Sequence, residues 1–300
     1  MGRPAGDERF SFGVVILTMG KRPDELLRGV ESVLSQEQVD LDVVVVGNGW
    51  QPTGLPESVK TLHLPQNLGI PGGRNAGVPK VSGEFLFFLD DDSWLLTPTF
   101  LADCARLIRN DPTVGMIQPR IVDPARRGEE PTRWIPRIRK GDPAHSSNVF
   151  AVAETALVLP REVFEATGGW PDPFFYAHEG IELAWRVWDA GRRVVYEGGL
   201  EVGHPVVDPA RHDEYLHMNA RNRVWLARRC LPWPVSWLYV ANWTGIQVLR
   251  WRREPDVLRV WFVGWRAGFR ELPWEPGRRP NKLSWRTVFR MGRQGRPPII

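Results

Sequence analysis

The sequence predicts an α/β fold with a mainly parallel, twisted sheet, helices on both faces and a C-terminal helical extension. From Phe12 onward, apolar strand-like runs alternate with amphipathic helix-like segments, which is the order of parallel βαβ units. The strand-like runs are almost continuously apolar, as in strands that are covered on both faces. With 300 residues, of which 42% are hydrophobic, the chain can bury a substantial core.

Each element of the first half follows from this pattern. Residues 12–18 (FGVVILT) read as a buried strand, and residues 23–36 carry apolar side chains three and four positions apart, as on a helix. Residues 41–49 read as a second strand that ends in turn residues. Further strands are expected at 59–65 and 84–90, separated by a Gly-rich segment and a short helix.

The second half is less regular. Residues 149–170 predict a strand and a helix that leads to a Gly-Gly turn, and residues 192–196 predict another strand. Beyond Arg221 the composition changes to helix-like, Trp-rich and basic sequence. We therefore expect two units, an α/β domain over residues 1–229 and a basic, Trp-rich helical extension over residues 230–300.

Three consecutive carboxylates, Asp90, Asp91 and Asp92, stand at the end of the apolar run FLFFL. Adjacent carboxylates repel one another, and a divalent cation such as Mg²⁺ or Mn²⁺ that shares their oxygens relieves the repulsion. Ligands of such sheets bind beyond the carboxyl ends of the strands, where Thr18 and Asn48 also fall. The alternative is a solvated acidic turn before the next helix.

Residues 67–78 (NLGIPGGRNAGV) are a second candidate binding element, expected between a strand and a helix. Their glycines allow backbone amides to approach a ligand, and the guanidinium of Arg74 can donate several hydrogen bonds to a phosphate. The spacing matches neither the P-loop nor the dinucleotide-binding pattern. The alternative is a Gly-rich helix entry without a ligand.

Further polar candidates lie after residue 170. A helix is expected within residues 174–191, and it carries Glu179 and Glu182 three positions apart, so both carboxylates project from about one side. The alternative is that these acids stabilise the helix N-terminus. His204 is either a metal ligand or a histidine with an ordinary structural hydrogen bond.

The cysteines and the first residues predict a cytoplasmic protein. Cys104 and Cys230 form neither a disulfide framework nor a cysteine metal site, which suits a reducing compartment. The first ten residues lack the apolar segment of a secretion signal and the pattern of a lipidation signal, so we expect no secretion through this end.

The C-terminal part is basic and rich in tryptophan. Residues 250–300 hold 13 basic and 4 acidic side chains although the net charge of the chain is only +4. Such a tail suits an anionic membrane surface or is a solvated face, and no nucleic-acid partner is expected because no nucleic-acid-binding module is recognisable. Residues 231–249 carry no charge. They suit a helix that lies on a membrane surface or one that packs on the α/β domain.

Four motifs occur in the order found in the family 2 inverting glycosyltransferases of GT-A fold. They are the N-terminal strand and helix, NLGIPGGRNAG, FLFFLDDDS and FFYAHEGIELAWR. The chain resembles this family over about residues 12–225, and its end, WRTVFRMGRQGRPPII, resembles members that build actinobacterial cell-surface polysaccharides. The resemblance implies a nucleotide-diphosphate sugar donor, a glycan or polyprenyl-linked acceptor, and Mn²⁺ or Mg²⁺ as cofactor.

The resemblance also implies roles for single residues. The donor would be bound by a nucleoside pocket at the first two strands, by groups near the nucleotide, by the aspartate motif and by an aromatic face for a sugar ring. The residues in these positions are Thr18, Asn48, Arg74, Asn75, Asp90, Asp91 and Trp170. Asp92 and His204 are the expected metal ligands.

The resemblance has two departures. Transfer with inversion needs a base that takes the proton of the acceptor hydroxyl. The family pattern is usually Glu-Asp-x-Asp with the second acid as base, but this chain has Gly180 there, so we expect Glu179 as base and Glu182 in support. Gly47 also stands where the family usually carries a carboxylate beside Asn48.

These features together predict a metal-dependent inverting glycosyltransferase. It would transfer a hexosyl or deoxyhexosyl group in cell-surface polysaccharide synthesis, in the cytoplasm or peripherally on the inner face of the plasma membrane. The two departures at Gly47 and Gly180 motivate the alternative, a non-catalytic nucleotide-sugar or glycan-binding protein of the same fold.

Overall fold

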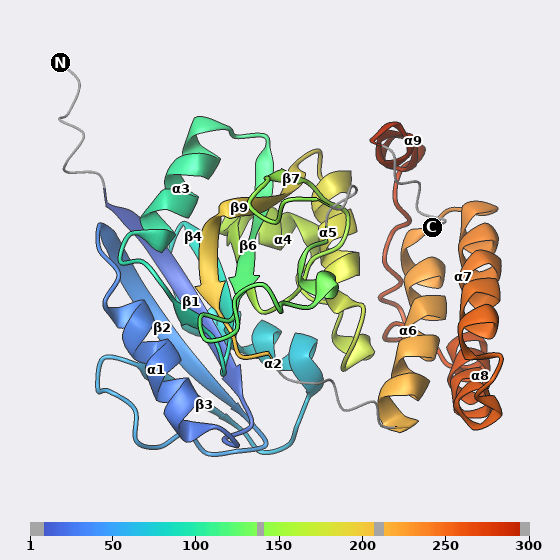
Figure 1. Ribbon diagram of the computed structural model, residues 1–300, viewed down its shortest axis with the longest axis horizontal. Helices are drawn as coiled ribbons and strands as arrows, with labels where there is room; N and C mark the ends of the chain where they lie inside the picture. Colours follow the sequence, from blue (N-terminus) through green and yellow to red (C-terminus); the bar gives the residue numbers. More distant parts are fainter. Residues whose placement is uncertain (1–8, 137–140, 207–212, 295–300) are drawn as a thin grey trace.

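The computed structural model describes residues 9–136, 141–206 and 213–294. The predictions for the first eight residues and for the last six lie outside these ranges. The described chain forms a nine-stranded sheet with helices on both faces, and a group of C-terminal helices stands beside it (Figure 1). The prediction of an α/β fold with a helical C-terminal part is confirmed.

The first four strands form a parallel half-sheet in the order β3-β2-β1-β4. Their bounds are Phe10–Thr18 for β1, Val39–Asn48 for β2, Lys60–Leu64 for β3 and Phe85–Asp90 for β4. The central strands are runs of buried Val, Ile, Leu and Phe because helices cover them on both sides. Since the strands are parallel, their carboxyl ends meet at one edge of the sheet.

The other half of the sheet is mixed. β8 (Ala156–Pro160) lies antiparallel to β4 and to β6 (Val114–Val122), while β9 (Arg193–Gly203) runs parallel to β6. The short strands β5 (Trp94–Leu95) and β7 (Ser147–Asn148) pair antiparallel with β9. The long ladders β1–β2, β1–β4, β2–β3 and β6–β9 are parallel, so the expectation of a mainly parallel sheet holds, with antiparallel pairing added by β8, β5 and β7.

Helices cover the sheet on both faces (Figure 1). α1 (Pro23–Leu34) and α3 (Phe100–Asn110) share one buried cluster with one side of the strands. α4 (Arg161–Thr167) and α5 (Glu179–Asp189) join the cluster on the opposite side. Within the described residues, short 3₁₀ segments span Val78–Lys80, Thr132–Trp134 and Asp172–Phe174.

The Gly-rich segment is itself a helix, α2 (Gly69–Gly77), and not a loop before one. A Cβ on Gly73 would lie 2.4 Å from a methyl carbon of Leu17, and one on Gly77 would lie 2.6 Å from a methyl carbon of Val15. These two glycines therefore let the helix backbone approach β1 closely. The expected phosphate-binding loop is corrected to a closely packed helix.

The C-terminal helices form one packed group. α6 (Asp213–Cys230) contacts both α7 (Val235–Trp251) and α8 (Pro255–Arg270), which lie beside each other, and α9 (Trp285–Arg293) follows (Figure 1). Side chains of α6, α7 and α9 belong to the same buried cluster as one face of the sheet. The division between residues 229 and 230 stays a prediction. None of the described helices combines the length and the apolarity that crossing a membrane requires.

Candidate active site

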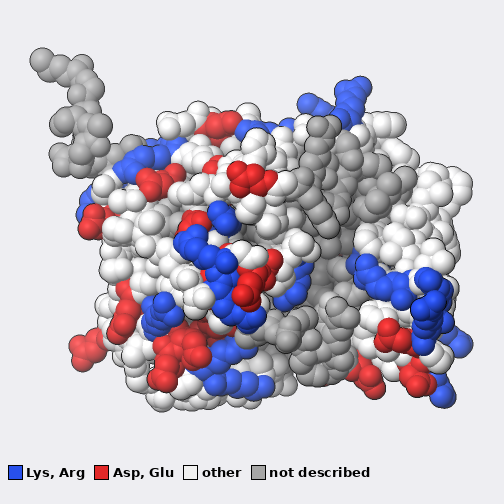
Figure 2. All heavy atoms as spheres, in the orientation of Figure 1, with Lys and Arg blue, Asp and Glu red and all other residues white. Residues whose placement is uncertain are grey.

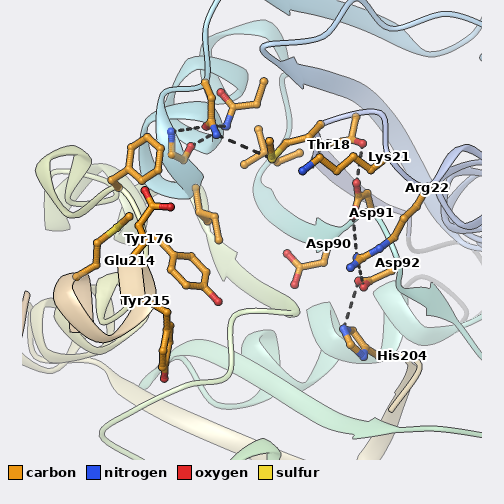
Figure 3. Close-up of a pocket in the computed structure, with 18 residues that line it drawn as sticks. Thr18, Lys21, Arg22, Asp90, Asp91, Asp92, Tyr176, His204, Glu214 and Tyr215 are labelled. Carbon is orange, nitrogen blue, oxygen red and sulfur yellow. Dashed lines mark hydrogen bonds and ion pairs between the residues drawn. The ribbon is translucent and has the colours of Figure 1, made fainter. Parts of the chain in front are cut away.

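A cavity of about 540 Å³ opens at the carboxyl edge of the parallel half-sheet. Figure 3 shows Asp90, Asp92 and His204 on one side of it, with Tyr176 and Tyr215 opposite. The cavity therefore lies where ligands of parallel sheets are expected.

Side chains from other strand ends hold Asp91 and Asp92 in place. The hydroxyl of Thr18 donates to Asp91 Oδ2 over 2.6 Å, because β1 and β4 are neighbours and end at the same level. His204 Nε2, after β9, lies 3.2 Å from Asp92 Oδ1, and Arg22 forms an ion pair with the other oxygen of Asp92. The predicted cluster is thus assembled from the ends of β1, β4 and β9.

The protonation of this cluster reflects burial and mutual repulsion. Burial, with the charge of Asp92 in addition, raises the pKa of Asp90 to about 7 although the Arg74 guanidinium opposes the rise. Burial would also raise the pKa of Asp92, but the hydrogen bond and charge of His204 hold it below its usual value. Burial alone would lower the pKa of the His204 imidazole. The hydrogen bond and the charge of Asp92 outweigh burial and raise this pKa above its usual value.

The same residues fit a divalent cation. One ligand atom each from Asp90, Asp92 and His204 lie within 4.8 Å of one another. That is about twice the ligand distance of ~2.0–2.6 Å found around Mg²⁺ and Ca²⁺. His204 Nδ1 lies 2.7 Å from the carbonyl oxygen of Pro205, and a donated hydrogen bond there leaves Nε2 free to ligate. Two carboxylates and an imidazole suit Mn²⁺.

The expected nucleoside end of the cavity is shaped by buried polar contacts. Asn48 lines the cavity, donates to the carbonyl oxygen of Gly69 over 3.0 Å, and accepts from the amide of Leu68 over 2.8 Å. A Cβ on Gly47 would lie 2.0 Å from the carbonyl oxygen of Trp50. The backbone of the following turn therefore occupies the space that a side chain at residue 47 would need.

Arg74 supports the acidic cluster from behind. Its side chain is buried, and its Nη2 donates to Asp90 Oδ1 over 2.7 Å and to the carbonyl oxygen of Glu154 over 2.9 Å. The guanidinium lies 4.7 Å from the ring centre of Trp170. Arg74 is not among the residues that line the cavity, so its contact with a phosphate stays a prediction.

Asn75 and Trp170 form a contact of their own. The Asn75 side chain donates to the carbonyl oxygen of Trp170 over 2.8 Å and accepts from its amide over 3.0 Å. The Trp170 side chain is buried and packs edge-on against Phe88. Neither residue lines the cavity, so contact of either with a donor stays a prediction.

Glu179, the expected base, is the first residue of α5 and is buried beside Glu154. Burial and the interaction with Glu179 raise the pKa of Glu154 well above its usual range. Burial raises the pKa of Glu179 as well. Sequence reasoning missed Glu154, although a single acid in the apolar run of residues 149–160 was a signal.

Glu182 lies in a different environment from Glu179 despite their common helix. Arg229 donates to Glu182 through Nε over 2.7 Å and through Nη2 over 2.9 Å, and Arg186 donates over 2.8 Å. The carboxylate is 1% exposed and does not line the cavity. The structure therefore does not group Glu182 with the acidic cluster, and its supporting role stays a prediction.

Two cations in the cavity wall were not singled out from the sequence. Lys21 and Arg22 follow β1 directly and line the cavity beside the aspartates (Figure 3). Their position after a strand end was the available signal, because such an edge collects ligand-binding residues. They add positive charge where a diphosphate would need it.

Comparisons with known proteins identify the family and the fold. The family model described as Glycosyl transferase family 2 matches residues 14–168. The pre-mycofactocin glycosyltransferase of Mycobacterium tuberculosis is 29% identical over 159 residues, which cover 49% of this chain and 32% of that protein. The chain thus spans about a third of the length of this relative.

Solved structures share the fold. GalNAc-T7 with UDP, GalNAc and Mn²⁺ superposes with a TM-score of 0.60 at 18% identity, over 77% of this chain and 50% of that chain. The mannosyltransferase PcManGT of Pyrobaculum calidifontis with GDP-Man and Mn²⁺ has a TM-score of 0.55 at 16% identity, over 88% and 77% of the two chains. Because the family model matches more than half of the sequence and these structures share its α/β architecture, the chain belongs to glycosyltransferase family 2 and has a GT-A fold.

Proposed function

We propose that the protein is a metal-dependent, inverting glycosyltransferase that uses a nucleotide-diphosphate sugar. The observation that carries the proposal is the cluster of Asp90, Asp92 and His204 at the edge of the cavity, next to Lys21 and Arg22. A carboxylate and imidazole set beside two cations suits a divalent ion together with a diphosphate. The two structural relatives contain Mn²⁺ with UDP or with GDP-Man, which supports this choice of ligand.

The residues have distinct tasks in this proposal. Asp90, Asp92 and His204 hold the cation, and Asp91 is kept in place by Thr18. A bound Mn²⁺ or Mg²⁺ supplies charge stabilisation for the departing diphosphate. Lys21 and Arg22 bind the phosphates from the cavity wall.

Inversion requires a base on the side opposite the leaving group. The proton of an acceptor hydroxyl must be removed as its oxygen attacks the anomeric carbon. We assign this task to the buried carboxyl pair that contains Glu179 and Glu154. Arg74 joins this pair to Asp90, because it contacts both groups.

The experiment is a screen of UDP-glucose, UDP-GlcNAc, UDP-GalNAc and GDP-mannose for thermal stabilisation of the protein. Each donor is tested with Mn²⁺, with Mg²⁺ and with a chelator. A ligand that binds the folded state raises its apparent stability, so a true donor raises the melting temperature only when the metal is present. Turnover of that donor, followed by determination of the anomeric configuration of the product, then tests transfer and inversion. A donor that binds equally well with chelator contradicts the metal requirement.

A non-catalytic sugar-nucleotide-binding protein is the second candidate. The observation that favours it is the burial of Glu179, which is only 1% exposed, together with the glycine at position 180. Metal-dependent binding of a donor without hydrolysis or transfer, over a panel of glycan and polyprenyl-phosphate acceptors, would establish this candidate instead.

We further propose that α7 places the enzyme on an anionic membrane surface, where a polyprenyl-linked acceptor is available for cell-surface polysaccharide synthesis. Trp237, Leu238 and Leu249 are 58%, 54% and 64% exposed on this helix. Figure 2 shows an uncharged region next to a band of basic side chains on this part of the molecule. Apolar insertion and basic charge together favour anionic lipid.

A further inference from the structure

Glu154 and Glu179 form a carboxyl pair behind the acidic cluster. Glu154 precedes β8, and the next residue, Thr155, accepts a hydrogen bond of 2.9 Å from the backbone amide of Asp90. Arg74 lies between the two sites, with Nη2 at 2.7 Å from Asp90 Oδ1 and Nη1 at 3.9 Å from Glu154 Oε2. The pair is therefore separated from the proposed metal ligands by a single side chain.

The two acids differ in access. The side chain of Glu154 is 19% exposed, whereas Glu179 is 1% exposed. Oε2 of Glu179 is buried and has no hydrogen-bond partner among the described residues. A proton shared between the two carboxyls relieves their mutual repulsion. Glu154 is thus the more exposed acid of the pair, although neither carboxyl is among the residues that line the cavity.

Gly180 fits the carboxylate of Glu154. Its amide donates to Glu154 Oε1 over 2.7 Å, and a Cβ on residue 180 would lie 2.5 Å from both Cγ and Oε1 of Glu154. A side chain at residue 180 and the present position of Glu154 therefore exclude each other. Glu154, which precedes β8, therefore occupies the space that an acidic side chain at residue 180 would need.

We propose that Glu154 is the general base of this glycosyltransferase and that Glu179 positions it. This inference rests on the proposed function. Glu154 takes the proton of the acceptor hydroxyl, and the bond from that oxygen to the anomeric carbon forms. The bond from the anomeric carbon to the diphosphate oxygen breaks, and its electron pair leaves with the nucleoside diphosphate. The proton then passes from Glu154 to solvent.

The charge state of the pair is compatible with this step. Burial and the charge of Glu179 raise the pKa of Glu154 well above its usual range, so Glu154 holds the shared proton at rest, and this proton passes to Glu179 before Glu154 accepts that of the hydroxyl. Two carboxyls that share one proton keep one negative charge, so the pair can take up a second proton during transfer.

The test compares Glu154→Gln and Glu179→Gln with the wild-type protein. We measure the affinity for UDP and GDP with Mn²⁺, and the kcat and KM of transfer or hydrolysis of UDP-sugars and GDP-mannose. Glu154→Gln should keep nucleotide affinity within about twofold and lose roughly a hundredfold or more in kcat. Glu179→Gln should lose less, because Glu154 still carries the accepting oxygen. Glu165→Gln, an exposed glutamate of α4, is the matched control and should behave as wild type.

Two variants at Gly180 keep the inference testable if Glu154→Gln does not fold. Gly180→Ala retains every acid but adds a methyl group where Glu154 lies, so it should lower kcat with little change in nucleotide affinity. Glu154→Ala combined with Gly180→Asp places a carboxylate in the same volume from the helix side. It should recover at least about tenfold in kcat over Glu154→Ala alone.

The outcomes separate the inference from the function on which it rests. A wild-type kcat in Glu154→Gln, with an active wild-type protein, overturns the role of Glu154 and leaves the glycosyltransferase proposal intact. So does a loss confined to nucleotide affinity, which indicates a purely structural role. A wild-type protein that binds no nucleotide with Mn²⁺ and turns over no donor overturns the proposed function and the inference with it.

Discussion

At the scale of single residues, the two carboxylate oxygens of Asp92 have different partners. One of its oxygens faces His204 and the other pairs with Arg22, while Asp90 is paired with Arg74. These contacts differ in what they leave available for a cation. The carboxylate of Asp92 can bind a cation together with the imidazole of His204. The charge of Asp90 is already partly neutralised by the guanidinium of Arg74.

We predict that Asp92→Asn weakens Mn²⁺-dependent nucleotide binding by at least about a hundredfold, since even outer-shell changes cost 10–100-fold in metal affinity. Asp90→Asn should have a smaller effect. Calorimetric titration of UDP or GDP with Mn²⁺ checks both, and Asp24→Asn, an exposed aspartate of α1, is the control. Wild-type Mn²⁺ dependence in Asp92→Asn would contradict its assignment as a ligand.

Gly47 provides a test of the backbone at the nucleoside end. A Cβ there meets the carbonyl oxygen of Trp50 at 2.0 Å, and a backbone atom cannot move aside as easily as a side chain. Gly47→Ala should therefore lower the free energy of unfolding by about 1–3 kcal/mol, the usual cost of overpacking. Chemical denaturation measures this loss, and Gly54→Ala, where no atom lies within 4 Å but φ is +73°, gives the cost of strain alone. An unchanged free energy of unfolding in Gly47→Ala would show that the Trp50 contact is relieved at no cost.

At the scale of elements, the ion pair between Glu182 and Arg229 joins α5 to α6. Both side chains are buried, and Arg186 adds a further donor from within α5. A charge that is left unpaired in the interior strongly destabilises the fold. The pair therefore favours the one packing arrangement of α5 and α6 in which the two charges meet. We therefore regard Glu182 as a residue that positions α5, at whose start Glu179 lies.

Glu182→Gln should lower the free energy of unfolding at pH 7 by about 3–5 kcal/mol, because it leaves a buried guanidinium without its charge partner. Urea denaturation of the full chain measures the loss. A variant as stable as wild type would show that the ion pair is not needed for packing. A large loss of kcat at unchanged stability would indicate that Glu182 takes part in catalysis.

The same ion pair predicts a pH dependence of stability. Burial alone would raise the pKa of Glu182, but Arg186 and Arg229 hold it below its usual value. A carboxyl with a lowered pKa stabilises the fold at pH values above its unfolded pKa of about 4.3, and this contribution is lost as pH falls through the folded pKa. The stability difference between wild type and Glu182→Gln should therefore shrink below about pH 4. A difference that grows in acid would contradict this sign.

At the scale of the whole molecule, the C-terminal helices combine two surfaces. Their inner side joins the core beneath the sheet, as Tyr239 on α7 does. Trp237, Leu238 and Leu249 form an exposed apolar stripe on α7, in which Leu238 and Leu249, eleven positions apart, share one helix face. The helix therefore both packs on the domain and offers an apolar face, so the two interpretations of residues 231–249 are compatible.

We predict that the full-length protein binds vesicles containing anionic lipid, with binding that weakens as salt rises. The combined variant Trp237→Ser, Leu238→Ser and Leu249→Ser should lose at least about tenfold in vesicle affinity, because its apolar contacts are gone while its charge is unchanged. Co-sedimentation measures the affinity, with Leu272→Ser as an exposed apolar control. Equal binding of the triple variant and the wild type would show that these three apolar side chains do not contribute to membrane binding.

The sequence by itself determined the alternation of strands and helices, the position of the aspartates at a strand end, and membership of the family. These features depend on local periodicity and on short motifs, so they can be read from neighbouring residues. Only the tertiary structure decided that residues 69–77 form a packed helix, that Glu182 faces Arg229, and that Glu154 lies over Gly180. Such contacts join residues 26 to 47 positions apart, and no local pattern specifies which distant side chain fills a given space. Burial and charge pairing make that choice when the sheet and helices pack.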